Sequence, residues 1–196
     1  KVRPVQPLSS DTTATNANEL QKVLSNRNVS PGTTIYLKGG IYKGEFKTKF
    51  SGKADSPITI RPVGKERVTI DGKLFLRGNG IIVRDLEFIS SSVKRPYGNF
   101  GKSADVPDKD LMVIIMGTNC KLINCVLHDG RASAIGLWAE AIDSEVYGNI
   151  IYYCGISKFG HGIYTHGSAT GTKYIANNII WGQSNIGITF HSVKPE

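Results

Sequence analysis

The segment VYGNIIYYCG, residues 146–155, resembles LINCVLHDG (122–130) before it and YIANNIIWGQ (174–183) after it. When the three segments are superimposed, apolar and polar residues fall into matching columns. These columns hold Val126, Ile150 and Ile179; Cys125, Asn149 and Asn178; and His128, Tyr152 and Trp181. The aligned residues Val126, Ile150 and Ile179 are 24 and 29 positions apart, and neither interval leaves room for a helix between the strands. Short strands repeated at this spacing predict a solenoid.

Each unit continues into a second apolar run: AIGLWAE (134–140), HGIYTH (161–166) and IGITFH (186–191). We align Leu137 with Ile163 and Ile188, which places Glu140, His166 and His191 in one column at the next corner. The first half of the chain also repeats, because the centres of TIYL, PITI and GIIV lie 23 residues apart, at Ile35, Ile58 and Ile81.

These repeats predict an all-β chain that forms a right-handed parallel β-helix with about 23–29 residues per turn, or rung. Equivalent residues of successive rungs would then lie one strand spacing apart, at about 4.8 Å. Asn149 and Asn178 support this arrangement. An amide repeated in one turn can hydrogen-bond the rungs above and below it and satisfy buried backbone groups.

The sequence divides into an N-terminal segment, 1–29, and a β-helix, 30–196, with a loop insertion at 91–110. Within the first segment, residues 17–25 predict a helix capped by Asn16 or Thr15, with Leu20, Val23 and Leu24 on one face. We expect this helix to cover the N-terminal end of the solenoid. The C-terminal rung has no comparable cap. In order of preference, the β-helix continues beyond this chain, a partner subunit covers the rung by self-association, or Lys194, Pro195 and Glu196 leave it bare.

The net charge of +8 comes from the first half, since residues 1–110 hold 19 Lys/Arg and 11 Asp/Glu. This excess favours an anionic partner. No nucleic-acid motif accompanies it, so we expect no nucleic-acid partner, and no apolar stretch is long enough for a membrane span. The three cysteines do not form a disulfide framework, and we expect buried thiols.

The opening segments PGTTIYLKGGIYKGEF (31–46) and SGKADSPITIRPVGKERVTIDG (51–72) resemble the first rungs of secreted pectate-lyase-like proteins. The likeness to this parallel β-helix superfamily extends over about residues 30–192. The superfamily contains lyases, hydrolases, epimerases, phage tailspikes and adhesive proteins, so the resemblance implies the fold more narrowly than the function. Its calcium-dependent lyases use clustered Asn and Glu ligands beside a Lys/Arg pair. This sequence has no Asn-x-Glu-x-Glu run, so Ca²⁺ is conceivable but no cofactor is expected.

A lyase acting on a uronate polymer needs a cation for the carboxylate, a base for the C5 proton and an acid for the leaving oxygen. Arg131 is the candidate cation, and His161, Tyr164 or His128 could exchange protons. A glycoside hydrolase would instead need two carboxylates, for which Asp129 and Glu140 are the candidates. The candidate catalytic residues are therefore Asp129, Arg131, Glu140, His161 and Tyr164.

Aromatic side chains near the GHGIYTHGS segment (160–168) could stack on sugar rings. The candidate substrate-binding residues are His128, Trp138, Phe159 and His166. A metal site formed by Glu140, His166 and His191 has no recognised ligand spacing, and none is predicted. Each of these side chains could equally serve only the fold, as a turn residue or a surface ladder.

Together, these features predict a protein, secreted or on a cell or virion surface, that binds an acidic polysaccharide; cleavage, by a lyase-like or hydrolase-like reaction, is left open. The alternative is a non-catalytic structural or adhesive subunit of a filament, spike or virion. The absence of a recognised catalytic motif favours the alternative, while the basic first half and the His-rich second half favour the enzyme.

Overall fold

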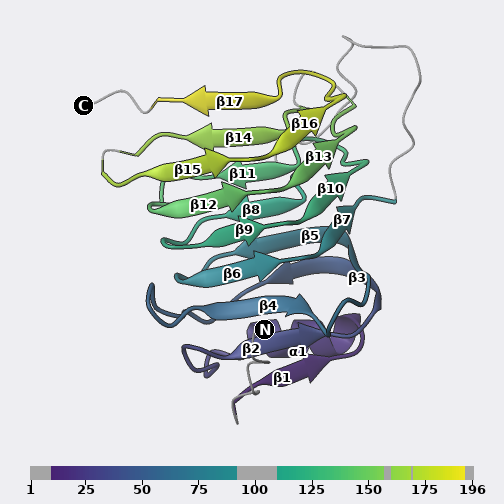
Figure 1. The fold of residues 1–196 in the computed structure, drawn as a ribbon, viewed down its shortest axis with the longest axis vertical. Coiled ribbons are helices and arrows are strands. Elements are labelled where there is room, and N and C mark those ends of the chain that lie inside the picture. Colours follow the sequence, from purple (N-terminus) through teal and green to yellow (C-terminus); the bar gives the residue numbers. More distant parts are fainter. Residues whose placement is uncertain (1–9, 92–109, 157–159, 169, 193–196) are drawn as a thin grey trace, which may run out of the picture.

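The computed structural model describes residues 10–91, 110–156, 160–168 and 170–192. Short parallel strands are stacked along one axis as a β-helix, from β1 beside α1 at one end to β17 at the other (Figure 1). This confirms the predicted parallel β-helix. The predicted insertion at 91–110 lies outside the described residues except for its two ends, and Phe159 also lies outside them.

One face of the solenoid is a seven-stranded parallel sheet. Its strands, in spatial order, are β1 (Thr12–Ala14), β2 (Thr34–Leu37), β4 (Ile58–Pro62), β6 (Ile81–Arg84), β9 (Lys121–Ile123), β12 (Ser144–Tyr147) and β15 (Lys173–Ala176). β1 lies within the predicted N-terminal segment, so the first strand of the sheet precedes the helix. The sequence repeats gave no sign of this strand.

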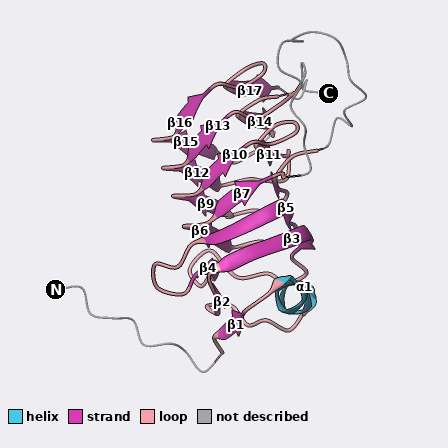
Figure 2. Ribbon diagram, turned by 90° about the vertical axis from the view of Figure 1, so that its right-hand side faces the viewer, coloured by secondary structure: helices cyan, strands magenta, loops and turns pink. Residues whose placement is uncertain are grey.

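The second sheet has ten strands and forms the other faces of the solenoid (Figure 2). One column contains β7 (Glu87–Ile89), β10 (Val126–His128), β13 (Ile150–Tyr152) and β16 (Ile179–Trp181). The other contains β8 (Val113–Ile115), β11 (Ile135–Leu137), β14 (Ile163–His166) and β17 (Ile188–His191). The long strands β3 (Gly40–Lys47) and β5 (Val68–Leu76) pair with each other, and β5 joins the columns by pairing with β7 and then with β8.

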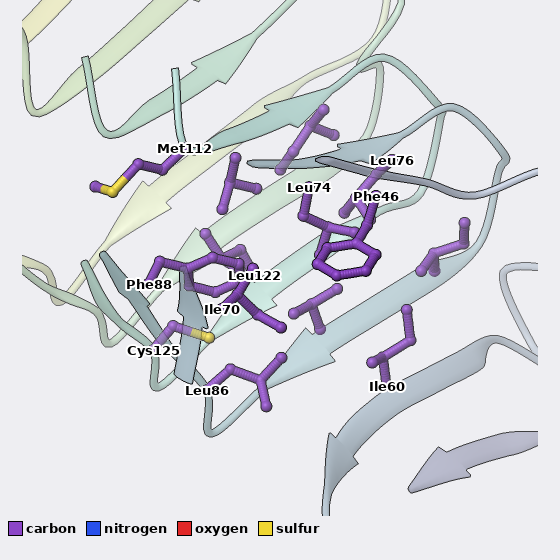
Figure 3. Packing of buried hydrophobic residues seen from close by; sticks show 14 of the residues in the cluster. Phe46, Ile60, Ile70, Leu74, Leu76, Leu86, Phe88, Met112, Leu122 and Cys125 are labelled. Carbon is purple, nitrogen blue, oxygen red and sulfur yellow. The ribbon is translucent and has the colours of Figure 1, made fainter. Parts of the chain in front are cut away.

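Inward-facing aliphatic and aromatic side chains from both sheets fill the centre of the solenoid. Phe46, Leu74, Phe88 and Leu122 belong to this core and are at most 3% exposed (Figure 3). Cys120, Cys125 and Cys154 are buried free thiols, as predicted. The core continues through the rungs, so each rung depends on its neighbours for burial of its apolar face.

The helix α1 (Ala17–Ser25) has the bounds that the sequence predicted. The side chain of Asn16 accepts a hydrogen bond from the Glu19 amide, and the Glu19 carboxylate accepts two from Thr15, which forms a capping box. Leu20 and Leu24 are buried, and the helix packs against β3 and β1. It therefore covers the N-terminal end of the ten-stranded sheet, as expected. No helix in the described segments is long and apolar enough to cross a membrane.

The register confirms part of the predicted alignment and corrects part. Val126 pairs with Ile150, which pairs with Ile179, as predicted. The alignment of Leu137 with Ile163 is wrong by two residues, because Ile135 pairs with Ile163 and Ile163 with Ile188. Side chains alternate between the faces of a strand, so a two-residue shift keeps the same faces inward and leaves the apolar pattern unchanged.

The same two-residue error affects the first half of the chain. Ile35 pairs with Ile60, whereas Ile58 pairs with Ile81, so the three predicted centres do not share one column. In the second half, His166 pairs with His191 as predicted, but the preceding rung contributes Trp138 rather than Glu140. The predicted column of Glu140 and two histidines is therefore wrong.

Candidate functional site

An aromatic ladder runs along the first column of the ten-stranded sheet. The His128 ring stacks on Tyr152 at 4.7 Å between centroids, and Tyr152 stacks on Trp181 at 4.7 Å. The rings are almost parallel because these residues occupy the same outward position of β10, β13 and β16. Ring stacks of this kind stabilise the rung register and cover the strand surface.

Glu87 connects this ladder to the basic first half of the chain. Its carboxylate accepts hydrogen bonds from Arg67 at 3.0 and 2.6 Å and one from the Thr69 hydroxyl, and it lies 3.1 Å from His128 Nε2. The bonds from Arg67 have the largest effect and lower the pKa of Glu87 to about 2, despite its burial. His128 Nδ1 lies 2.7 Å from Asp129 Oδ2, so carboxylates face both ring nitrogens.

We expect Glu87→Gln to reduce the free energy of unfolding by about 2 kcal/mol at neutral pH, less than the full pKa difference implies because Arg67 is exposed. The folded-state pKa lies below the ordinary value of 4.5. The ion pair therefore stabilises the fold above about pH 4.5, and this contribution is lost as the pH falls towards 2. Urea unfolding from pH 7 to 3 should show a smaller pH dependence in the variant.

Glu145→Gln is the matched control, because the Glu145 carboxylate pairs across the strands with Lys121 at 2.8 Å and with no other cation among the described residues. It should cost less than about 1 kcal/mol. Equal losses in the two variants at neutral pH would contradict the role assigned to the Glu87 network.

Five side chains on the second column form what we call the histidine–aromatic cluster: Trp138, His161, Tyr164, His166 and His191. The Tyr164 ring is central, with ring centroids at 5.7 Å from Trp138, 5.5 Å from His161, 5.1 Å from His166 and 4.9 Å from His191. Trp138 also contacts His166 edge to face at 5.0 Å. Two successive rungs therefore bring three imidazoles and a phenol to one surface, beside the indole of the preceding rung.

His161 is the most enclosed of these imidazoles, at 7% exposure. Its Nδ1 lies 3.1 Å from the Thr189 hydroxyl, and its amide donates to the Ser133 hydroxyl. Burial, with a smaller contribution from His191, lowers the pKa of His161 below its ordinary value. Burial is also the main cause that lowers the pKa of His166. Both rings are therefore neutral at pH 7 and able to accept a proton.

A third group surrounds a cavity of about 330 Å³ where β3 and β5 bend. We call it the bend pocket. Gly44 and Gly72 lie at the bend with φ of +147° and +145°. Its charged lining residues are Lys43, Glu45, Asp71, Lys73, Asp110 and Arg131. Lys73 is 2.6 Å from Asp110 Oδ1, and Arg131 Nε is 3.7 Å from Asp110 Oδ2.

The predicted site residues are thus divided among three places. His161, Tyr164, His166 and Trp138 come together in the histidine–aromatic cluster. His128 belongs to the aromatic ladder, and Asp129 contacts it there. Arg131 lines the bend pocket, and Glu140 is exposed in the turn after β11. Their catalytic and binding roles stay predictions.

The loop that carries Arg131 and the loop that carries His161 lie on adjacent rungs. The Ile156 amide donates to the Arg131 carbonyl, and the Ala134 amide donates to the His161 carbonyl. The candidate cation and the candidate base are therefore in neighbouring layers of the same face. Glu87, Lys43, Lys73 and Asp110 were not predicted, because their partners lie 18 to 41 positions away in the chain or in another rung.

Within the described residues, no group of three or more His, Cys, Asp or Glu side chains could hold a metal ion. Asp71, Glu87 and Asp110 are each already engaged by basic or hydroxyl groups. These three carboxylates are therefore not free to act as calcium ligands, and the absence of a cofactor stays a prediction.

Comparison with known proteins gives a family match. The model of the family described as chondroitinase B matches residues 14–133, more than half of the chain. A search of curated proteins found no match.

Two solved structures share the fold. An alginate lyase from Paenibacillus sp. str. FPU-7 is 22% identical with a TM-score of 0.62, and the match covers 93% of this chain and 58% of that one. A mannuronic acid specific polysaccharide family 6 lyase from human gut microbiota is 18% identical with a TM-score of 0.60, and the match covers 84% of this chain and 40% of that one. The chain thus spans well under two thirds of the length of either.

Proposed function

Because the chain belongs to the chondroitinase B family, we propose that it binds and cleaves an acidic polysaccharide as a lyase. The observation that carries the proposal is the family match over residues 14–133. The solved structures with the same fold are named as lyases of alginate and of a mannuronic acid polymer, which supports a uronate-containing substrate.

The proposed reaction is a β-elimination on the outer face of the ten-stranded sheet. A cation binds the uronate carboxylate and makes the proton on C5 more acidic. A base removes that proton, the electron pair forms the C4–C5 double bond, and the C4–O4 bond breaks. The departing O4 takes a proton from an acid, and the products are an unsaturated sugar end and a new reducing end.

Residues on adjacent rungs can supply these groups. Arg131 lines the bend pocket and is the proposed cation. His161 in the neighbouring layer is neutral at pH 7 and is the proposed base, since burial lowers its pKa. The Tyr164 hydroxyl is the proposed acid, because its ring lies 5.5 Å from the His161 ring. Trp138 and His166 would support the sugar ring.

The geometry supports a hydrolase less well. Such an enzyme needs two carboxylates flanking one glycosidic bond. Asp129 is engaged by His128, and Glu140 is exposed in the turn after β11. The two candidates thus lie in different surroundings: Asp129 is beside His128, whereas Glu140 acts electrostatically on His166 of the histidine–aromatic cluster.

The test is incubation with a panel of uronate polymers, read by ultraviolet absorbance of unsaturated ends and by new reducing ends. We expect both signals together, and His161→Asn should lower the rate by about 100-fold. Asparagine keeps a hydrogen-bonding group near Thr189 but cannot exchange the proton. Lys65→Gln, an exposed turn residue, should keep full activity.

New reducing ends without ultraviolet absorbance would indicate hydrolysis and contradict the lyase. Full activity in His161→Asn would remove His161 from the reaction. Binding without any product would favour the alternative, a structural or adhesive subunit.

The location and self-association are further proposals. An acidic polysaccharide as substrate supports a secreted protein or one on a cell or virion surface. Self-association through the C-terminal rung stays a prediction.

A further inference from the structure

We infer that the bend pocket is a subsite for the anionic group of a sugar unit, held by Lys43 together with Arg131. The inference rests on the proposed function and names two residues that would recognise the substrate. Lys43, on β3, lies far from Arg131 in sequence, and only the bend of β3 and β5 brings them to one cavity.

The first support is the shape of the pocket. β3 and β5 run side by side, and their paired residues Gly44 and Gly72 have no side chain at the bend. The lining of the cavity of about 330 Å³ combines the apolar side chains of Leu111 and Met112 with charged groups. A cavity with an apolar wall and convergent polar groups is the usual form of a small-ligand site.

The second support is that the carboxylates of the pocket already have partners. Asp71 accepts hydrogen bonds from the Ser91 amide at 2.8 Å and hydroxyl at 2.5 Å. Burial acts to raise the pKa of Asp71, but these bonds, with Lys43, lower it below its usual value. Asp110 receives Lys73 at 2.6 Å, and Glu45 receives Lys47 at 2.5 Å.

The third support is that Lys43 and Arg131 retain their hydrogen-bond donors. Lys43 Nζ lies 3.6 Å from Asp71, and Arg131 Nε lies 3.7 Å from Asp110, so both pairs are longer than hydrogen bonds. Among the described residues, no shorter polar contact engages either cation. The pocket has as many cationic as anionic lining residues. The hydrogen-bond donors that stay available belong to the cations Lys43 and Arg131, so the complementary ligand is an anion.

A carboxylate of a uronate and a sulfate ester share the chemistry that this pair of cations recognises. Arg131 can offer two parallel N–H groups, and Lys43 adds a point charge from β3, on the other side of the pocket from the rung that carries Arg131. We expect the carboxylate to be the occupant, because the proposed substrate carries one on every uronate unit.

The experiment is calorimetric titration of a uronate hexasaccharide into His161→Asn protein, in which cleavage of the probe should be about 100-fold slower. Lys43→Gln and Arg131→Gln should each weaken binding by about tenfold. Lys43→Arg should restore most of the affinity. Lys65→Gln removes the same charge on an exposed turn and should change the affinity less than twofold.

Two further probes identify the anion. The hexasaccharide with its carboxyl groups reduced to alcohols should bind the parent protein at least tenfold more weakly. A sulfated neutral oligosaccharide that binds as tightly, and loses affinity in Lys43→Gln, would make sulfate the occupant and overturn the carboxylate assignment. Equal losses in Lys43→Gln and Lys65→Gln would overturn the subsite itself, since only net charge would then matter.

The two proposals fail separately. Products from wild-type protein, with equal affinities of Lys43→Gln and Lys65→Gln, would contradict the subsite and keep the lyase. Loss of binding in Lys43→Gln, with no ultraviolet-absorbing product from any polymer, would contradict the lyase and keep the subsite.

Discussion

Asn149→Ala should reduce the free energy of unfolding by about 4 kcal/mol, because the Asn149 side-chain amide satisfies buried backbone groups of the preceding rung. Its Oδ1 accepts from the Cys125 amide at 2.9 Å, and its Nδ2 donates to the Leu122 carbonyl at 3.0 Å and to Asn178 Oδ1 at 2.9 Å. The side chain is fully buried, so water cannot replace these bonds. Chemical unfolding followed by circular dichroism measures the loss.

Two asparagine variants provide the comparison. Asn178→Ala removes the next member of the same ladder, but Asn178 is partly exposed, and water can take over its bonds, so about half the loss is expected. Asn28→Ala changes an exposed residue and should stay within about 0.5 kcal/mol of the parent. An Asn149→Ala protein as stable as Asn28→Ala would refute the ladder as a source of stability.

Gly72→Ala should destabilise the chain by about 3 kcal/mol or more, since a methyl group has no room at the bend. A Cβ at Gly72 would lie 2.0 Å from the Gly44 carbonyl oxygen, a backbone atom that cannot move without breaking the pairing of β3 and β5. The residue also has a φ of +145°, which side chains rarely adopt. Thermal unfolding should shift down by roughly 10 °C.

Gly40→Ala separates the two causes. Gly40 lies on β3 with a φ of +150°, close to that of Gly72, but nothing is within 4 Å of its Cβ position. The free energy of unfolding that Gly40→Ala loses is therefore the cost of the backbone conformation alone, about 1 kcal/mol. If both variants lose the same stability, close packing at the bend contributes nothing, and the stated reason for the bend glycines is wrong.

The repeating part of this fold could be predicted without coordinates. The columns around Asn149 and Val126 follow from short segments of similar sequence, and the Cys125–Asn149–Asn178 ladder follows from that alignment. The helix at 17–25 could be placed because its cap and apolar face are local. In each case the interacting residues lie in one turn or in equivalent positions of like segments.

The candidate site was predictable only in part. His161, Tyr164 and His166 were recognised because they occupy one short segment, and their contacts lie within it or with the next rungs. The sequence placed Glu140 beside His166, whereas the structure has Trp138 there. The predicted register was wrong by two residues, and a shift of two residues leaves the same side chains facing inward. No apolar pattern can detect such a shift.

The amino-acid sequence by itself determined that strands would stack, which residues face inward and where the helix begins. Only the tertiary structure decided which polar side chains meet. Glu87 reaches His128 across 41 positions, and Lys43 shares a cavity with Arg131. The physical reason is that a β-helix places residues side by side according to the length of every intervening turn and loop. Those lengths vary from rung to rung. They depend on where each strand begins and ends, which packing over the whole core decides and no local motif reveals.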